Sequence, residues 1–139
     1  MTQIKFNGIP LTTMADVEPG HVIVALGGSV RLAATFQGEP ATYELATGKF
    51  LMPYHDTAVV VVLEGNCNHI ADRQVDELKN LAVGDVWRTP LGAGYMKVSG
   101  TEENLYAWCV DITTGEVEKF DGSTVVQPMD VEFVFTDIG

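Results

Sequence analysis

Short runs of apolar and β-branched residues, separated by turn-forming residues, dominate the first half of this chain. Residues 22–26 form such a run, which ends at a glycine pair that permits a hairpin turn. Similar runs follow, with Gly, Pro and Asp between them, at residues 30–36, 42–46, 49–52 and 58–63. Five short strands within about 45 residues predict a small barrel or a tightly rolled sheet.

The rest of the chain repeats this pattern with different side chains. Gly20 recurs as Gly84, and Gly48 recurs as Gly115, each within a similar local sequence. The offset between matched positions stays between 64 and 67 residues. An internal repeat constrains the architecture before any single element is assigned. Because a unit of about 60 residues buries only ~60% of its unfolded surface, two such copies gain stability by sharing one core.

We therefore predict an all-β fold made of two tandem, degenerate SH3-like small-barrel repeats that share a core. The first repeat spans residues 1–65, a connector spans 66–80, and the second repeat spans 81–139. Residues 4–11 and residues 131–135, the latter with strict alternation of apolar and polar side chains, are expected to add edge strands at the two ends.

Two segments carry expectations of their own. The connector has good helix formers at 71–79 but few apolar residues on one face, so one or two helical turns and a strand through 70–75 both remain open. Residues 105–112 are apolar on both faces. A strand of that kind is buried on both sides, either between the copies or against another subunit.

The charge balance of the chain excludes several classes of function. The 139 residues include 8 Lys and Arg against 19 Asp and Glu, a formal net charge of −11. Such a surface repels phosphate backbones, so we expect no nucleic-acid binding. No apolar run approaches the roughly 20 residues of a membrane span, and the first residues lack the layout of a signal peptide. We expect neither a transmembrane segment nor secretion.

The sequence contains no pattern that predicts catalysis, and we expect no enzyme, no metal and no cofactor. Cys67 and His69 form one short-spaced ligand pair, whereas structural zinc sites use two. His55 and Asp56 are adjacent, so on a strand their side chains would point to opposite faces. With Cys109, the chain has two cysteines, which are too few for a disulfide framework and are expected as buried free thiols.

Aromatic residues are the remaining candidates for contact with other molecules. They anchor interfaces when exposed and fill cores when buried, and most of them here lie at strand positions. Tyr54 lies in a predicted loop beside His55, and Trp87 is followed by Arg88. We predict that these four residues bind a partner protein.

A second, longer pattern covers residues 78–130. Its elements are Val-Gly-Asp-Val with an aromatic residue at 83–87, Tyr-Met-Lys-Val at 95–98, Thr-Gly-Glu at 114–116 and a valine pair at 125–126. The pattern resembles small all-β bacteriophage proteins of unknown function. The first copy departs from it, since Ile23 stands in place of the aromatic residue. The resemblance implies a phage origin; its motif consists of turns and strands and carries no active site.

From these observations we predict a non-enzymatic bacteriophage accessory or structural protein. A small virion decoration protein or an attachment-associated module that acts by protein–protein contact is the expected type. Its partners would be copies of itself in a homo-oligomer and a viral or host protein, and its location the virion or the host cytoplasm. The alternative is an acidic inhibitor or ligand-sequestering protein that acts on a host or defence protein by electrostatic steering.

Overall fold

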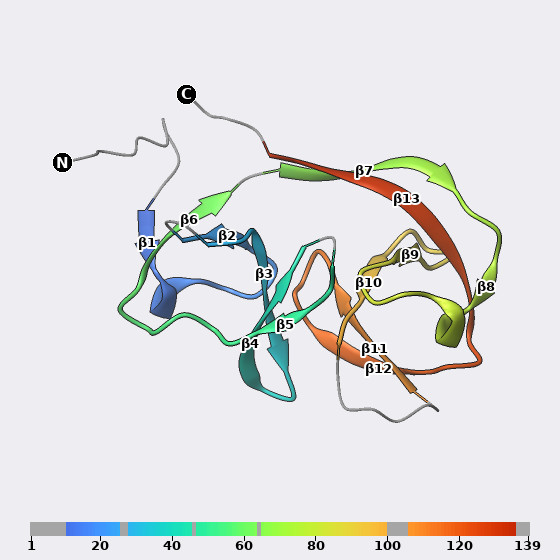
Figure 1. Ribbon diagram of the computed structural model, residues 1–139, viewed down its shortest axis with the longest axis horizontal. Coiled ribbons are helices and arrows are strands. Elements are labelled where there is room, and N and C mark those ends of the chain that lie inside the picture. The colour runs from blue at the N-terminus through green and yellow to red at the C-terminus, as the bar shows by residue number, and fades with distance from the viewer. Residues whose placement is uncertain (1–10, 26–27, 46, 64, 100–105, 136–139) are drawn as a thin grey trace.

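The computed structural model describes residues 11–25, 28–45, 47–63, 65–99 and 106–135 (Figure 1). Over these residues the protein is all-β, with thirteen strands in two open antiparallel sheets and two short 3-10 turns. Most of the predicted N-terminal strand lies outside the described residues. No helix in the described ranges is long and apolar enough to cross a membrane.

The first sheet has the strand order β1-β6-β2-β3-β4-β5. Its strands are β1 (Leu11–Thr13), β2 (Val22–Val24), β3 (Arg31–Phe36), β4 (Glu39–Glu44), β5 (Phe50–Leu51) and β6 (Val59–Leu63). The 3-10 turn η1 (Met14–Asp16) follows β1. A tight turn joins β3 to β4 at Gln37 and Gly38, where both φ angles are positive, as the preferred hairpin turns require.

The second sheet has the strand order β12-β11-β10-β9-β13-β7, and β8 also pairs with β13. Its strands are β7 (Gly65–Asp72), β8 (Asp76–Glu77), β9 (Val86–Arg88), β10 (Gly94–Lys97), β11 (Tyr106–Asp111), β12 (Val117–Asp121) and β13 (Val125–Phe135). The second 3-10 turn, η2 (Leu78–Asn80), follows β8. Below, the first half means β1–β7 and the second half means β8–β13.

Of the two alternatives for the connector, the strand is observed as far as Asp72, and helical geometry is limited to one 3-10 turn at its end. Strand β7 occupies its first part and continues to Asp72, and only the three residues of η2 are helical. The reason is tertiary: the second half of β13 offers its backbone hydrogen bonds to β7, and this pairing overrides the good local helix propensity of residues 71–79.

The residues predicted to form a C-terminal edge strand belong to a longer strand. Residues 131–135 continue β13 and pair with β7, whereas the residues of β13 that pair with β9 are 127–129. Figure 1 shows β13, in red, running beside the green β7. The long strand therefore joins the second half to the chain segment that ends the first.

The backbone hydrogen bonds of the first half recur in the second. Gly20 N donates to Ala33 O over 2.8 Å, and Gly84 N donates to Lys97 O over the same distance. The pairing between β7 and β13 follows the same correspondence, because Cys67 lies opposite its own counterpart in the repeat, Phe133. The two halves are thus related by a two-fold pseudosymmetry axis that passes through this strand pair.

A turn of each half is hydrogen-bonded to a strand end of the other half. Thr35 N of the first half donates to Gly115 O of the second over 2.8 Å. At the related position, Ser99 N of the second half donates to Gly48 O of the first over 3.0 Å. Each Thr-Gly turn is therefore held by the opposite half. The sheets themselves are open, and closure of either half into an SH3-like barrel stays a prediction.

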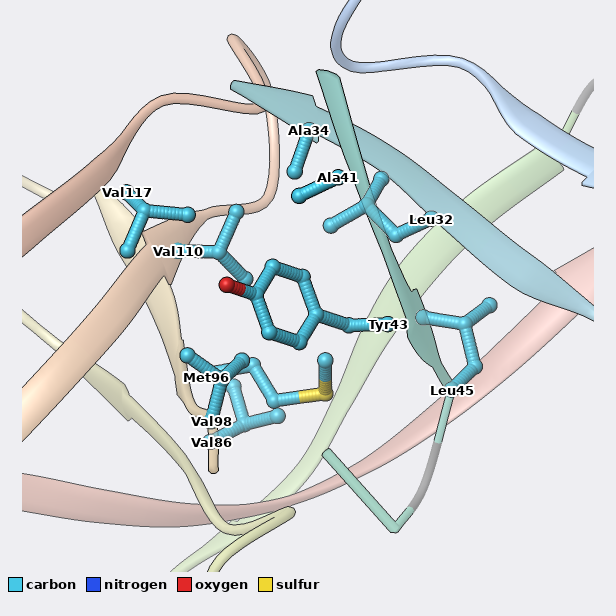
Figure 2. Close-up of a cluster of buried hydrophobic side chains, with 10 residues drawn as sticks. All are labelled: Leu32, Ala34, Ala41, Tyr43, Leu45, Val86, Met96, Val98, Val110 and Val117. Atoms are coloured by element: carbon cyan, nitrogen blue, oxygen red, sulfur yellow. The ribbon is translucent and has the colours of Figure 1, made fainter. Parts of the chain in front are cut away.

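The central core is built from both halves. Figure 2 shows the ring of Tyr43 between Ala34 and Ala41 of the first half and Met96 and Val110 of the second. The buried residues of this central core are Leu32, Ala34, Ala41, Tyr43, Leu45, Val86, Met96, Val98, Val110 and Val117. Burial raises the pKa of Tyr43 to about 12, so its hydroxyl stays protonated at neutral pH.

A smaller apolar cluster flanks this core on each side. Ile23 belongs to the cluster of the first half, and Trp87, its counterpart in the repeat, belongs to that of the second. Strand β11 lies between two clusters: Val110 faces the central core, while Ala107 and Cys109 face the cluster of the second half. Burial on both faces therefore holds for residues 107–110, whereas Tyr106 at the start of the strand is 41% exposed.

Candidate binding sites

A cavity of about 490 Å³ opens in the second half beside the start of β13. We call it the β13 cavity. Residues of β9, β12 and β13 meet there, and its lining includes Val75, Trp87, Arg88, Phe120, Val125 and Gln127. Its volume falls within the range of small-molecule and side-chain binding pockets, and its wall is mostly apolar.

Trp87 forms part of the wall of the β13 cavity from a buried position. Its side chain is only 2% exposed, and its ring stacks on Tyr95 at 4.7 Å and meets Phe120 edge-on at 5.2 Å. The indole N–H donates to Cys109 Sγ over 3.4 Å. The sequence predicted Trp87 as a contact residue, and the structure places it in the core behind the cavity.

Arg88 lies at the rim, where its charge already has a partner. Its Nη2 lies 3.0 Å from Asp72 Oδ2, and the other carboxylate oxygen of Asp72 lies 2.9 Å from His69 Nε2. All three side chains are largely exposed, so these pairs add little to stability. Their effect is to neutralise the one charged side chain that lines the cavity.

Two exposed valines beside the β13 cavity escaped the sequence analysis. Val75 is 52% exposed and Val125 is 63% exposed, although both are large apolar residues. Val125 was recognised only as part of a valine pair typical of a strand. The alternation of side chains along β13 is a signal for the exposure of Val125, because adjacent residues of a strand face opposite sides and Val126 is buried.

Tyr54 and His55 lie in the first half, away from the β13 cavity. Tyr54 lines a second cavity of about 180 Å³, which we call the η1 cavity, while His55 is exposed and its Nδ1 lies 3.0 Å from Thr57 Oγ1. The guanidinium of Arg31 stacks over the Tyr54 ring at 4.1 Å. The four residues predicted to bind a partner therefore belong to two different places on the molecule.

The turn η2 is held by a lysine that sequence analysis did not single out. Lys97 Nζ donates to Leu78 O over 2.8 Å and to Leu81 O over 2.7 Å, and the lysine side chain is partly buried. These are hydrogen bonds from a charged donor to the carbonyls of the first residue of the turn and of the residue that closes it, and such bonds are stronger than neutral ones.

We expect Lys97→Met to lower the free energy of unfolding by about 2 kcal/mol, because two carbonyls lose a charged donor while the apolar part of the chain is kept. Chemical denaturation followed by circular dichroism measures this. Lys79→Met is the matched control: Lys79 is exposed and, among the residues that the structure describes, pairs only with Glu77 at 3.1 Å, so its loss should cost less than about 1 kcal/mol. Equal losses in the two variants would contradict the role given to Lys97.

The cysteines differ in environment. Cys109 is fully buried, and burial raises its pKa to about 11, so the thiol is protonated and unreactive at neutral pH. Cys67 is exposed, which corrects the expectation of two buried thiols; the cause is its place on β7, at the edge of the sheet. Among the residues that the structure describes, no three His, Cys, Asp or Glu side chains gather to hold a metal ion.

Comparison of the chain with protein-family models, with curated protein sequences and with solved structures finds no match in any of the three.

Proposed function

We propose that the chain is a non-enzymatic protein-binding module, made of two SH3-like repeats, that assembles with copies of itself as an accessory or structural component of a bacteriophage. The observation that carries the proposal is the β13 cavity with exposed apolar residues at its rim. The resemblance of residues 78–130 to small phage proteins supports the phage setting.

The β13 cavity has the chemistry of a pocket for an apolar side chain. Phe120 and the indole of Trp87 contribute to its wall, and the charge of Arg88 is taken up by Asp72. Aromatic-walled pockets that exclude water provide most of the energy in protein–protein contacts. A leucine or similar side chain would occupy part of this space without leaving a buried charge unpaired.

The chain itself carries a side chain suited to the cavity. Leu91 lies on the loop between β9 and β10, next to Pro90, which lines the cavity, and it is 97% exposed. In a two-fold assembly, Leu91 of each copy enters the cavity of the other, which buries both apolar surfaces at once. A self-complementary contact of this kind explains why so large an apolar side chain is held in solvent.

We expect the wild-type protein to form dimers or larger assemblies at tens of micromolar in sedimentation equilibrium, and Leu91→Asp and Val125→Glu to be monomeric. Val59→Glu is the matched control, because Val59 occupies the corresponding position on β6, is 58% exposed and lines neither cavity. A wild-type monomer, or a Val125→Glu variant that assembles like the wild type, would overturn the proposed contact.

Salt dependence separates self-assembly from the alternative function. The net charge of −11 favours capture of a basic host protein, which would make this chain an inhibitor. Chains of like charge repel, so added salt should strengthen self-assembly, whereas salt should weaken capture of a basic partner. Mass spectrometry of purified phage particles provides the second test: a decoration protein is found there and an early inhibitor is not.

A further inference from the structure

The 3-10 turns of the two halves are held in the same way. Met14 N, at the start of η1, donates to Ala58 O over 2.8 Å, and Leu78 N, at the start of η2, donates to Thr124 O over 2.9 Å. In both turns, the residue before the turn and the residue after it have extended backbone conformations. The carbonyl groups at the ends of the two turns are therefore presented in corresponding positions.

The ends of the turns also match. Val17 closes η1 with φ −78° and ψ 129°, and its N–H donates to Met14 O over 3.2 Å. Leu81 closes η2 with φ −75° and ψ 143°, and its N–H donates to Leu78 O over 3.1 Å. Within the part of the chain that the structure describes, a lysine ammonium completes this arrangement in the second half alone, where Lys97 donates to the carbonyls of the first and closing residues.

Alanine stands where the first half would need the equivalent of Lys97. Ala33 occupies the same place in β3 as Lys97 does in β10. The carbonyl of Ala33 accepts the N–H of Gly20 over 2.8 Å, and the carbonyl of Lys97 accepts the N–H of Gly84, the counterpart of Gly20, over the same distance. The Ala33 methyl group is buried and ends where the lysine chain would continue. The η1 cavity, lined by Met14, Val17 and Ala33, lies there.

The remaining lining of the η1 cavity also suits a cation. Among the described residues that line it, Asp56 is the charged one, and Tyr54 lines it too, although one face of the Tyr54 ring already carries the Arg31 guanidinium at 4.1 Å. Carbonyl oxygens and a carboxylate are acceptors suited to the N–H groups of an ammonium ion. At about 180 Å³ the cavity has room for a short alkyl chain, since a water molecule takes roughly 30 Å³ of liquid volume.

We propose that the η1 cavity binds a primary alkylammonium group, that of a lysine side chain or of a small free amine. The ammonium donates to the carbonyls of Met14 and Val17, as Lys97 does to those of Leu78 and Leu81, and its charge is balanced by Asp56. The site is separate from the β13 cavity, so it does not depend on self-assembly and its test has an independent outcome.

The test is a titration followed by the backbone amide signals of the ¹⁵N-labelled protein. We expect Nα-acetyl-lysine N-methylamide to shift the amides of Met14, Val17 and Ala33. Nα-acetyl-norleucine N-methylamide, which has the same alkyl chain but no ammonium, should not shift them. Putrescine is the second arm: tighter binding of the lysine derivative assigns the site to a protein side chain, and tighter binding of putrescine assigns it to a small amine.

Two variants test the geometry. Ala33→Lys should place its own ammonium at the carbonyls of η1, as Lys97 does at those of η2, and abolish binding. Gln74→Lys adds the same charge at an exposed position between β7 and β8 and should bind like the wild type. Asp56→Asn changes an exposed side chain without threatening the fold and should weaken binding about two- to five-fold.

Three results would overturn the proposal: equal shifts with the norleucine derivative, binding that persists in folded Ala33→Lys, or unchanged affinity in Asp56→Asn. The last result decides the question even if Ala33→Lys fails to fold. Loss of self-assembly in Leu91→Asp has no bearing on these measurements, because Leu91 lies in the other half of the molecule and does not line the η1 cavity.

Discussion

Gly115→Ala is expected to lower the free energy of unfolding by roughly 3 kcal/mol or more. The residue has φ +75°, and a β-carbon there would lie 2.7 Å from Ala33 O and closer still to Gly20 N. Both are backbone atoms of the opposite half, which cannot move aside without breaking the hydrogen bond that joins them. Guanidinium denaturation followed by tryptophan fluorescence measures the loss.

Gly38→Ala provides the control for this prediction. Gly38 also has positive φ, at +81°, but no atom lies within 4 Å of the position of a β-carbon. Its substitution therefore measures the cost of the backbone conformation alone, about 1–2 kcal/mol. Gly48→Ala should behave like Gly115→Ala, since its β-carbon would lie 2.6 Å from Gly84 N. If Gly115→Ala and Gly38→Ala lose the same stability, the turns are not held as described.

Trp87→Ala is expected to cost about 3–5 kcal/mol of stability, the usual loss when a large aromatic residue is removed from a core. The substitution removes the ring that packs on Tyr95 and Phe120 and leaves a void next to the β13 cavity. Circular dichroism should follow the unfolding, because the variant loses one of the two tryptophans of the chain.

Arg88→Ala separates the structural role of Trp87 from a role in contact. Arg88 is exposed and paired only with Asp72 among the described residues, so its removal should cost less than about 1 kcal/mol. A Trp87→Ala variant that is as stable as Arg88→Ala but fails to assemble would contradict the buried role and favour the contact role predicted from sequence.

The parts of the fold that depend on backbone requirements could be predicted from sequence. Gly48 and Gly115 both adopt positive φ, and both lie in turns that the repeat had placed in register. The run at 58–63 and the strand through 106–111 appear where the apolar pattern put them. Turn residues and alternation act locally, so a sequence records them directly.

The parts that depend on distant partners could not be predicted. Residues 66–72 are mostly polar, and they form a strand because β13 supplies hydrogen bonds from the far end of the chain. The Arg88 that follows Trp87 in the sequence favours a contact role for the tryptophan, but the neighbouring strands bury its ring. The repeat in the sequence matches Lys97 with Arg31, whereas the backbone hydrogen bonds of Gly20 and Gly84 match it with Ala33. Nothing local in the sequence shows that the Lys97 ammonium reaches the carbonyls of η2.

The hydrogen bonds between a turn of each half and a strand end of the other make the two halves one folding unit. The hydrogen bond between Thr35 and Gly115 joins residues about 80 positions apart, and that between Ser99 and Gly48 crosses the same boundary in the opposite direction. Neither half can complete its backbone pairing while the other is unfolded. Long loops must close before these contacts form, so we expect folding to be slow for a chain of this length and the whole molecule to unfold in one cooperative transition.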